Sequence, residues 1–350
     1  MMTDRISSPP TAEVPQDETR QWHALREGAV LARLADRAQI ALTGADRHAF
    51  LQGLLTNDIA SLASGTGCYA AWLTPQGRML TDLHVLEAGD MMLLDVPLAE
   101  AGPTLARLDQ FLFGEDVQFA DLSGNIADVW VHGPAAASLL DSVLTGTAGL
   151  AQWEDYRNAR VEFGGEPVVV ARISQLGVPG FVAYTSLPVA AALADALSAS
   201  GAVRVSASIA EASRIEAGYP LYGVDMTEDT IPLEAGIEDR ALSFSKGCYV
   251  GQEVVVRILH RGHGRVARRL VGLRVAGAVP HRGDRIHAAG GDGPDIGWVT
   301  SAASSPALGA VALGYVHRDH VEAGSAVRIV TTGGEVAATV TTRPMPRGVQ

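Results

Sequence analysis

Two side chains that could do chemistry together, Lys246 and Cys248, stand two residues apart in this chain. Lys246 is the only lysine among 27 lysines and arginines, and Cys248 is one of 2 cysteines in 350 residues. Arginine replaces lysine wherever any cation serves, whereas a compact ammonium that can lose a proton requires lysine. Because a nearby positive charge lowers the pKa of a thiol, we expect Lys246 to activate Cys248 as a reactive thiolate.

Other roles for Cys248 stay open on local grounds. A lone cysteine is often a buried structural thiol, and a disulfide with Cys68 would need an oxidising compartment. A metal site would need further ligands, and the His-x-x-His pair His260 and His263 is weak evidence for one. The first residues contain no apolar leader segment, so we expect a reducing cytoplasm, no disulfide and no metal.

Asp82 is the second candidate, because it lies between the strand-forming residues Met79–Thr81 and Leu83. A carboxylate among apolar neighbours can act as a general acid or base, or accept a hydrogen bond from the N–H of a heterocycle. An aspartate at an exposed strand position is an equally good interpretation of these residues.

Arginine is concentrated between Arg257 and Arg285, where Asp284 is the only acidic residue. The whole protein has a net charge of −12, so its entire surface is not expected to bind nucleic acid non-specifically. The local positive stretch could hold a polyanion, such as a polyglutamate tail, a phosphate or RNA. It could equally be a solvated surface that acids elsewhere in the fold neutralise.

The helices and strands that must position these residues fall into two regions. Up to about residue 265, strands are expected at Tyr69–Leu73 and Met79–Leu86 and a helix at Leu98–Phe113. After it, short β-rich segments separated by Gly, Pro, Asp and Ser predict a small all-β barrel. We therefore predict an α+β fold organised as a disordered tail over 1–20, an α+β region over 21–265 and a barrel over 266–345.

The segment Lys246–Glu253 (KGCYVGQE) resembles the signature K-G-C-Y-x-G-Q-E of the YgfZ family, whose members bind folate and support iron–sulfur cluster assembly or repair. Further similarity, over roughly residues 25–340, is carried by Phe50–Gly53, Leu55–Asp58, Gln76–Arg78 with Asp82, Arg214–Gly218 and Leu221–Asp225. These segments are shared with a sister family, the aminomethyltransferase or T protein of the glycine cleavage system.

The resemblance implies a tetrahydrofolate-binding, aminomethyltransferase-like α+β fold with a C-terminal β-barrel. The cofactor it implies is tetrahydrofolate or a one-carbon derivative. It assigns catalytic roles to Cys248, Lys246 and Asp82. The residues expected to bind the cofactor are Tyr69, Asp82, Asp95, Arg214, Tyr249 and Gln252.

Three departures separate this chain from the aminomethyltransferase family. The family's Y-T-G-E-D-G-F-E segment is Gln175–Val182 here, so both glutamates are valines, and its Arg-Asp pair is Ala210–Glu211. A glutamate can accept two hydrogen bonds from the guanidine-like edge of a pterin, and each donor left unpaired costs about 1–3 kcal/mol. The family also lacks the cysteine found here at Cys248. We therefore expect weaker or different folate binding, and aminomethyl transfer is the less expected activity.

The main expectation from the resemblance is a tetrahydrofolate-binding auxiliary protein that supports iron–sulfur cluster assembly or repair in client enzymes, including tRNA-modifying ones. The alternative is a folate-dependent aminomethyltransferase or one-carbon transferase of the T-protein type, and whether the protein turns over a substrate is left open. The expected partners are iron–sulfur client proteins, with a weak RNA contact through Arg257–Arg285. We expect a cytoplasmic monomer without a membrane span, because no apolar run approaches eighteen residues.

Overall fold

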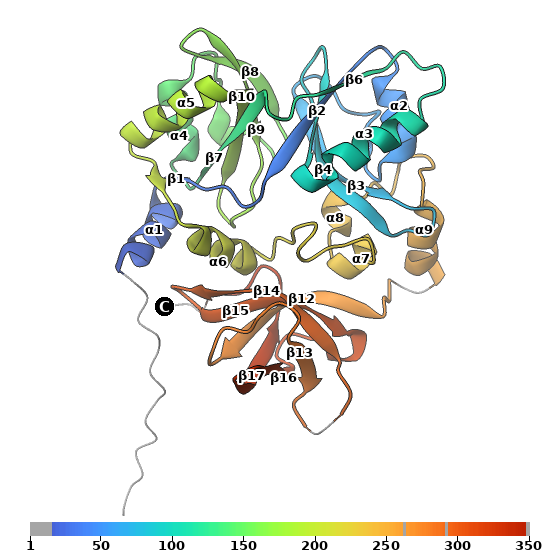
Figure 1. Cartoon of the computed structure of the whole chain (residues 1–350), viewed down its shortest axis with the longest axis vertical. Helices are drawn as coiled ribbons and strands as arrows, with labels where there is room; N and C mark the ends of the chain where they lie inside the picture. Colours follow the sequence, from blue (N-terminus) through green and yellow to red (C-terminus); the bar gives the residue numbers. More distant parts are fainter. Residues whose placement is uncertain (1–15, 262–263, 291–292, 348–350) are drawn as a thin grey trace, which may run out of the picture.

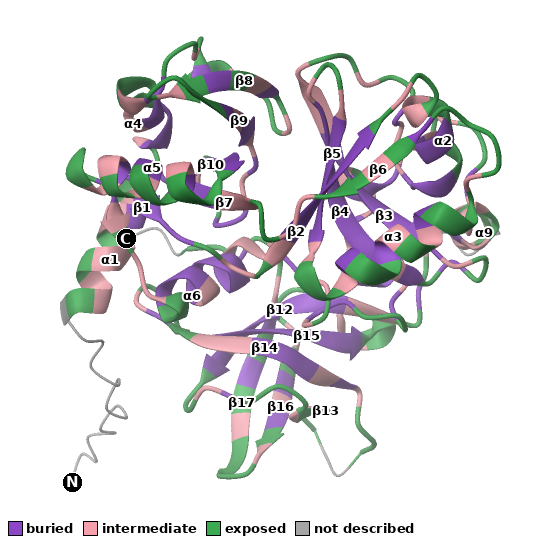
Figure 2. Cartoon of the chain, turned by 45° about the horizontal axis from the view of Figure 1, so that its top comes forward, coloured by how far each residue is buried: buried purple, intermediate pink, exposed green. Residues whose placement is uncertain are grey.

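Three parts make up the protein in the computed structural model, which describes residues 16–261, 264–290 and 293–347. Two α+β halves, mainly residues 37–121 and 126–204, lie side by side above a β-barrel of residues 268–341 (Figure 1). Buried residues line the strands of all three parts (Figure 2). Each part therefore has an apolar core of its own.

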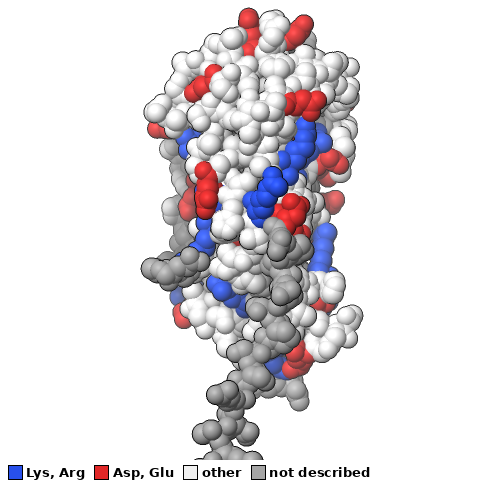
Figure 3. Space-filling view, turned by 90° about the vertical axis from the view of Figure 1, so that its left-hand side faces the viewer, with Lys and Arg blue, Asp and Glu red and all other residues white. Residues whose placement is uncertain are grey.

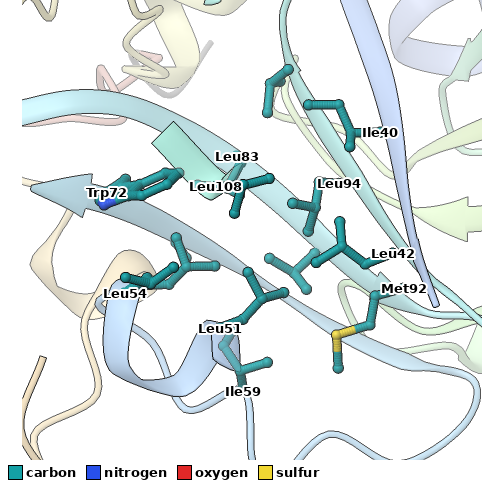
Figure 4. Packing of buried hydrophobic residues seen from close by; sticks show 14 of the residues in the cluster. Ile40, Leu42, Leu51, Leu54, Ile59, Trp72, Leu83, Met92, Leu94 and Leu108 are labelled. Carbon is teal, nitrogen blue, oxygen red and sulfur yellow. The ribbon is translucent and has the colours of Figure 1, made fainter. Parts of the chain in front are cut away.

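The first half is a five-stranded antiparallel sheet in the order β3-β4-β5-β2-β6. Its strands are β2 (Arg37–Thr43), β3 (Thr66–Leu73), β4 (Met79–Glu87), β5 (Met92–Pro97) and β6 (Gln118–Asp121). Helices α2 (Arg47–Leu54) and α3 (Ala101–Gln110) contribute Leu51 and Leu108 to a core with Leu42, Leu83 and Leu94 (Figure 4). Because side chains alternate along a strand, the neighbours of these core residues point to the other face of the sheet.

That other face carries most of the polar residues of the candidate site. Tyr69 of β3 alternates with Cys68 and Ala70, which belong to the core under the helices. His84 of β4 and Asp95 of β5 alternate with core residues in the same way, and the register of the sheet pairs them directly. The period of two therefore gathers these side chains on one buried surface.

The second half is a six-stranded sheet in the order β11-β1-β7-β10-β9-β8. Its strands are β1 (Val30–Leu31), β7 (Ile126–His132), β8 (Asn158–Phe163), β9 (Glu166–Arg172), β10 (Gly180–Ser186) and β11 (Val203–Arg204). Helices α4 (Ala136–Val143) and α5 (Leu187–Ala199) pack on it through Leu140 and Leu193. Helix α1 (Gln16–Glu27) packs beside it through Leu25.

Short helices connect the halves with the barrel: α6 (Ala207–Ala217), α7 (Pro232–Ala235), α8 (Glu238–Ala241) and α9 (Gln252–Arg261). Helix α6 ends at Gly218, whose φ is +67°. A Cβ atom there would lie 2.5 Å from the Cβ of Arg343, so glycine permits both the backbone turn and the approach of the C-terminal segment. The backbone N–H of Met345 then donates to the carbonyl oxygen of Glu216 at 2.8 Å. The backbone at Met345 is thereby fixed against α6.

The C-terminal part is a closed barrel in the order β12-β15-β14-β13-β16-β17. Its strands are β12 (Arg268–Ala276), β13 (Arg285–Ala288), β14 (Gly297–Ser305), β15 (Gly309–His317), β16 (Ala326–Thr331) and β17 (Gly334–Thr341). Apolar residues from every strand fill it, as the core residues Leu273, Ile286 and Val299 illustrate. The predicted α+β fold with a C-terminal β-barrel is confirmed.

The structure differs from the sequence-based expectations in detail at two places. The helix expected at Leu98–Phe113 begins as a 3-10 turn at Leu98–Glu100 and continues as α3 only to Gln110. Of the tail expected over 1–20, residues 1–15 lie outside the described part, and the remainder begins helix α1. That helix is held in place because Leu25 is fully buried and Arg26 donates to Glu216 at 3.0 Å.

Within the described ranges, no helix combines the length and the apolar character that crossing a membrane requires.

Candidate functional site at the central cavity

A cavity of about 540 Å³ lies where the second half, α6, α8 and the C-terminal segment meet. Its walls include the loop 174–179, the end of α6 at Gly218, Tyr219, Arg240 and Arg343. Arg343 donates hydrogen bonds to the carbonyl oxygens of Ala235 at 2.6 Å and Gly236 at 3.3 Å, which fixes this side of the cavity. Ligand sites for small organic molecules typically have this volume.

Arg240 and Tyr219 form the inner wall of this cavity, and Tyr69 contacts Arg240 from behind. The guanidinium carbon of Arg240 lies 4.5 Å from the ring centre of Tyr219 and 5.2 Å from that of Tyr69. A cation over an aromatic face is attracted by the electron density of the ring. Tyr219 and Arg240 line the cavity, so Tyr69 lies behind them, in contact with Arg240.

Tyr69 and Asp82 form a buried pair on neighbouring strands. The Tyr69 hydroxyl donates to Oδ2 of Asp82 at 2.7 Å, and both residues are buried. The other oxygen of Asp82, Oδ1, is buried and has no hydrogen-bond partner among the described residues. Burial raises the pKa of Tyr69 well above its usual range, so the phenol stays protonated and remains a donor. An unpaired buried acceptor is costly unless a ligand or water satisfies it. Asp82 Oδ1 is such an acceptor, although Asp82 is not among the residues that line the cavity.

Asp95 lies beside this pair but is fully engaged within the protein. Its Oδ2 accepts from Arg37 Nε at 2.7 Å and from His84 Nδ1 at 2.8 Å, and its Oδ1 accepts from Gln39 Nε2 at 3.0 Å. Burial alone would raise the pKa of Asp95, but the positive charge of Arg37 and these hydrogen bonds lower it to about 2. The carboxylate that was expected to bind the cofactor instead organises its protein neighbours.

Arg214, also expected to bind the cofactor, holds α6 and the barrel together. It is fully buried, and its Nη1 donates to Asp225 Oδ2 at 2.7 Å and to the carbonyl oxygen of Tyr219 at 2.8 Å. Asp225 Oδ1 in turn accepts from Thr300 at 2.5 Å and Ser301 at 2.6 Å of strand β14. The guanidinium of Arg214 is thus saturated away from the cavity. Its contribution to the site is to hold the backbone of Tyr219.

Lys246 uses its ammonium to bind backbone carbonyl oxygens. Its Nζ donates to the carbonyls of Gln52 at 2.7 Å, Leu55 at 2.6 Å and Asn57 at 2.7 Å. The Asn57 side chain donates in turn to the carbonyl of Tyr69 at 2.8 Å and that of Arg240 at 3.0 Å. Burial lowers the pKa of Lys246 to about 8, so most molecules still carry the charge at pH 7. The lysine therefore stabilises the loop that holds two residues of the site.

Cys248 is exposed, and Cys68 is buried; both thiols are free. The three N–H groups of Lys246 point to carbonyl oxygens, so the expected activation of Cys248 by Lys246 has no hydrogen bond to support it. Burial raises the pKa of Cys68 to about 12. In the described ranges, which leave out His263, no group of His, Cys, Asp and Glu could hold a metal ion.

Tyr249 and Gln252, the remaining residues expected to bind the cofactor, lie away from the cavity walls. Tyr249 is buried in the apolar cluster around Leu73 and Met226, and the Lys246 ammonium lies 5.2 Å from its ring centre. Gln252 begins α9, and its backbone N–H donates to the carbonyl of Tyr249 at 3.2 Å. Of the predicted site residues, the structure brings Tyr69, Asp82 and Asp95 together. Tyr249 shares an apolar cluster with Tyr69, and neither Tyr249 nor Cys248 nor Gln252 lines the cavity.

Three residues of the site were missed in the sequence: His84, Tyr219 and Arg240. His84 stands two residues after Asp82 on the same strand, so the alternation of side chains could have placed it on the same face. Tyr219 lies just after the end of α6, and Arg240 lies within the short helix α8. At neither place does a local sequence pattern distinguish a site residue from an ordinary one. Only the packing of distant segments shows their role.

Three of the eight arginines in the stretch 257–285 pair with acids of the described chain. Arg268 pairs with Glu234 at 3.2 Å and Arg285 with Asp295 at 3.5 Å, while Arg269 pairs with Glu238. On the face shown in Figure 3, basic and acidic side chains likewise lie close together. These pairings favour the interpretation as a solvated surface, and an RNA contact stays a prediction.

Comparisons with known proteins match nearly the whole chain. The family described as GCVT N-terminal domain matches residues 10–246, and the glycine cleavage T-protein C-terminal barrel domain matches residues 268–345. An aminomethyltransferase of Saccharopolyspora erythraea is 31% identical over 94% of this chain and 90% of its own length. An aminomethyltransferase of Geobacillus kaustophilus is 29% identical over 93% of this chain and 90% of its own length. The crystal structure of glycine cleavage system aminomethyltransferase T from Bartonella henselae has a TM-score of 0.82 and 26% identity, and covers 94% of this chain and 90% of that one.

These relatives contradict the expected role as an auxiliary protein for iron–sulfur clusters. They are named aminomethyltransferases and match over almost the full chain, which favours the alternative expectation of a folate-dependent aminomethyl or one-carbon transferase. The prediction gave too much weight to a short signature around Cys248 and to the lost glutamates of one loop.

Proposed function

This chain belongs to the glycine cleavage T-protein family, and we propose that it is a tetrahydrofolate-dependent aminomethyl or one-carbon transferase. The observation that carries the proposal is the unpaired oxygen Oδ1 of Asp82, buried next to the Tyr69–Asp82 hydrogen bond. A carboxylate oxygen in that position suits a ligand with N–H groups, as a reduced pterin has. The folate cofactor expected from the sequence agrees with membership of this family.

Asp82 has two roles in this proposal. Its Oδ2 is held by the Tyr69 hydroxyl, so the carboxylate is fixed in one orientation. Its Oδ1 is free to accept an N–H hydrogen bond and to take or return the proton of a reacting nitrogen. Bound tetrahydrofolate would supply the nitrogen that carries the one-carbon unit.

Arg240 and Tyr219 give the cavity a cationic and aromatic wall. An aromatic face and a planar guanidinium both stack on a flat heterocycle, which is how such rings are commonly held in binding sites. Arg172 and Arg343 also line the cavity, against Asp239 as the one acid there in the described chain. This excess of positive charge suits a ligand that carries carboxylate groups.

The valines in place of the family's two glutamates bear on how a pterin is held. Val178 lines the cavity, and Val182 is fully buried in β10. Neither side chain can accept a hydrogen bond, so donors of the ligand have to be paired elsewhere, and Asp82 offers one of the two buried carboxylate oxygens without a partner in the described chain, the other being on Glu238. We infer that the ligand is held chiefly at the Asp82 side of the site.

The test is tetrahydrofolate binding and turnover by the wild-type protein and by Asp82→Asn. Isothermal titration should give measurable affinity for tetrahydrofolate. Release of ammonia from an aminomethylated lipoyl carrier should require both tetrahydrofolate and Asp82, with a loss of at least about a hundredfold in kcat for Asp82→Asn. Asp90→Asn, in the turn after the same strand β4, is the matched control, because Asp90 is exposed and pairs with Arg160. Absence of turnover with an authentic carrier would overturn the proposed activity.

A finer assignment within the family rests on the signature alone. We propose that the chain belongs to the branch that resembles YgfZ proteins, because Lys246–Glu253 matches that signature and the T-protein family lacks the cysteine. The half-buried Lys246, the buried Tyr249 and the exposed Cys248 divide this segment into a structural part and an accessible thiol. A reactive role for Cys248 remains a prediction, tested below by thiol labelling.

A further inference from the structure

A continuous chain of hydrogen bonds leads from the core of the first half to the wall of the cavity. Arg37 and Gln39 donate hydrogen bonds to the carboxylate of Asp95. His84 Nδ1 lies 2.8 Å from Oδ2 of the same carboxylate. His84 Nε2 lies 3.3 Å from the hydroxyl oxygen of Tyr219, which lines the cavity. All of these groups except part of Arg37 are buried. The three residues Asp95, His84 and Tyr219 are called the relay below.

The chemistry of each group fixes where the protons of the relay lie. An ionised carboxylate can only accept hydrogen bonds, so Nδ1 of His84 must carry a proton toward Asp95. In a neutral imidazole the other nitrogen, Nε2, is then an acceptor, and the Tyr219 hydroxyl must donate to it. The hydroxyl proton of Tyr219 is thus directed into the protein, and the lone pairs of its oxygen are left to donors on the cavity side, where Arg240 and Gln175 also lie.

The surroundings of His84 keep its ring neutral. Burial lowers the pKa of His84, the nearby positive charge of Arg37 lowers it further, and Asp95 and Asp82 oppose this effect. The rings of Tyr69, Trp130 and Tyr156 lie 5.7, 6.5 and 6.0 Å from the imidazole. An imidazolium would have to be formed in this aromatic enclosure, where charge is poorly solvated.

We propose that Asp95 and His84 are positioning residues that orient Tyr219 as a hydrogen-bond acceptor for an N–H edge of the ligand in the central cavity. This inference rests on the proposed function, since it takes the ligand to be a reduced pterin. It also supplies an acceptor on the wall where Val178 offers none. Gln175 Nε2 donates to the same hydroxyl only at 3.5 Å, so it restricts the hydroxyl oxygen weakly.

The first test is a double-mutant cycle on tetrahydrofolate affinity. Tyr219→Phe should bind about tenfold more weakly, as expected for one lost hydrogen bond. His84→Gln should lose a similar factor, and the double variant should lose no more than either single one, because both act through one hydroxyl. Tyr315→Phe, a buried tyrosine of the barrel that does not line the cavity, is the control and should bind as the wild type does. The proposal would be overturned if the double variant lost affinity by the product of the two single losses. It would also be overturned if Tyr219→Phe bound tetrahydrofolate as tightly as the wild type.

The second test measures the tautomer of His84 in the protein without any ligand. In ¹⁵N-edited NMR spectra, His84 should be the neutral Nδ1–H tautomer from pH 6 to pH 8, and its Nε2 signal should shift in Tyr219→Phe. An Nε2–H tautomer would overturn the relay, whatever the folate measurements give. If the wild-type protein failed to bind tetrahydrofolate, the proposed function would fall, and the tautomer would still decide the orientation of Tyr219. Thermal melts of each variant confirm that it is folded.

Discussion

Lys246 donates a hydrogen bond to the carbonyl oxygen of Asn57 at 2.7 Å, and the side chain of Asn57 holds the backbone of Tyr69 and Arg240. The only lysine of the chain thus supports two residues of the candidate site from behind. The contact explains why a lysine stands at this position in an arginine-rich chain, because a compact ammonium can point its three N–H groups at three carbonyls while a planar guanidinium cannot.

Replacing this lysine should therefore destabilise the fold. Lys246→Met leaves the carbonyls of Gln52, Leu55 and Asn57 without their donor, and we expect the free energy of unfolding to fall by about 1–3 kcal/mol. Lys246→Arg should recover only part of the loss. Urea unfolding followed by circular dichroism measures both. Full stability of Lys246→Met would show that water replaces the ammonium without cost.

The two thiols should differ sharply in reactivity. Cys248 is exposed, whereas Cys68 is buried and burial raises its pKa to about 12. Ellman's reagent should therefore titrate one thiol in the native protein and two in guanidinium chloride, and Cys248→Ser should remove the native signal. If Cys248 is a reactive thiolate, its labelling rate should also exceed that of free cysteine at pH 7. A rate equal to that of a model thiol would contradict a reactive role.

His132 should make the protein less stable in mild acid. Its ring is fully buried against Trp130, neither nitrogen has a hydrogen-bond partner in the described chain, and burial lowers its pKa from 6.5 to about 4. The unfolded chain takes up a proton at His132 below about pH 6.5, whereas the folded protein does so only near pH 4. Stability is therefore complete above pH 6.5 and falls as the pH drops toward 4, by roughly 3 kcal/mol.

The measurement is urea unfolding of the wild type and His132→Phe between pH 4 and 7. The variant should show a flatter profile, because phenylalanine has no proton to gain. His84, whose pKa is also lowered, titrates in both proteins and cancels in the comparison. Parallel profiles for the two proteins would show that His132 is protonated without cost.

Arg214 should be the most sensitive single position in the link between α6 and the barrel. Arg214→Met leaves Asp225 as a buried charge without its partner, and we expect a loss of about 3–5 kcal/mol. The double variant Arg214→Met with Asp225→Asn should recover part of this, because the uncompensated charge is removed. Thermal unfolding compares the three proteins. Equal melting temperatures of the single variant and the wild type would contradict a structural role for Arg214.

The sequence predicted the parts of the site that depend on local periodicity. Tyr69 and Asp82 lie on adjacent strands of one hairpin, so their proximity follows from short-range pairing and alternation. The partners of Lys246 could not be predicted, because backbone carbonyls leave no mark in a sequence. The contacts of Arg214 could not be predicted either: a charged residue in a motif was expected to bind the cofactor, and its hydrogen bonds lie in a buried interface.

The central cavity also depends on contacts between residues distant in the chain. Tyr219 and Arg240 come together because α6 and α8 pack under the two halves, and Arg343 arrives from beyond the barrel. Such contacts are fixed by the tertiary arrangement and by no repeat or spacing along the sequence. The sequence therefore predicted the strands and the barrel better than it predicted which residues line the cavity.

The position of Arg343 has a consequence for how the protein is made. The ribosome synthesises the two halves first, the barrel next and Arg343 with Met345 last, yet these last residues fix one wall of the cavity and the end of α6. A nascent chain that still lacks them has an incomplete cavity. Ligand capture should therefore begin only after translation has passed the barrel.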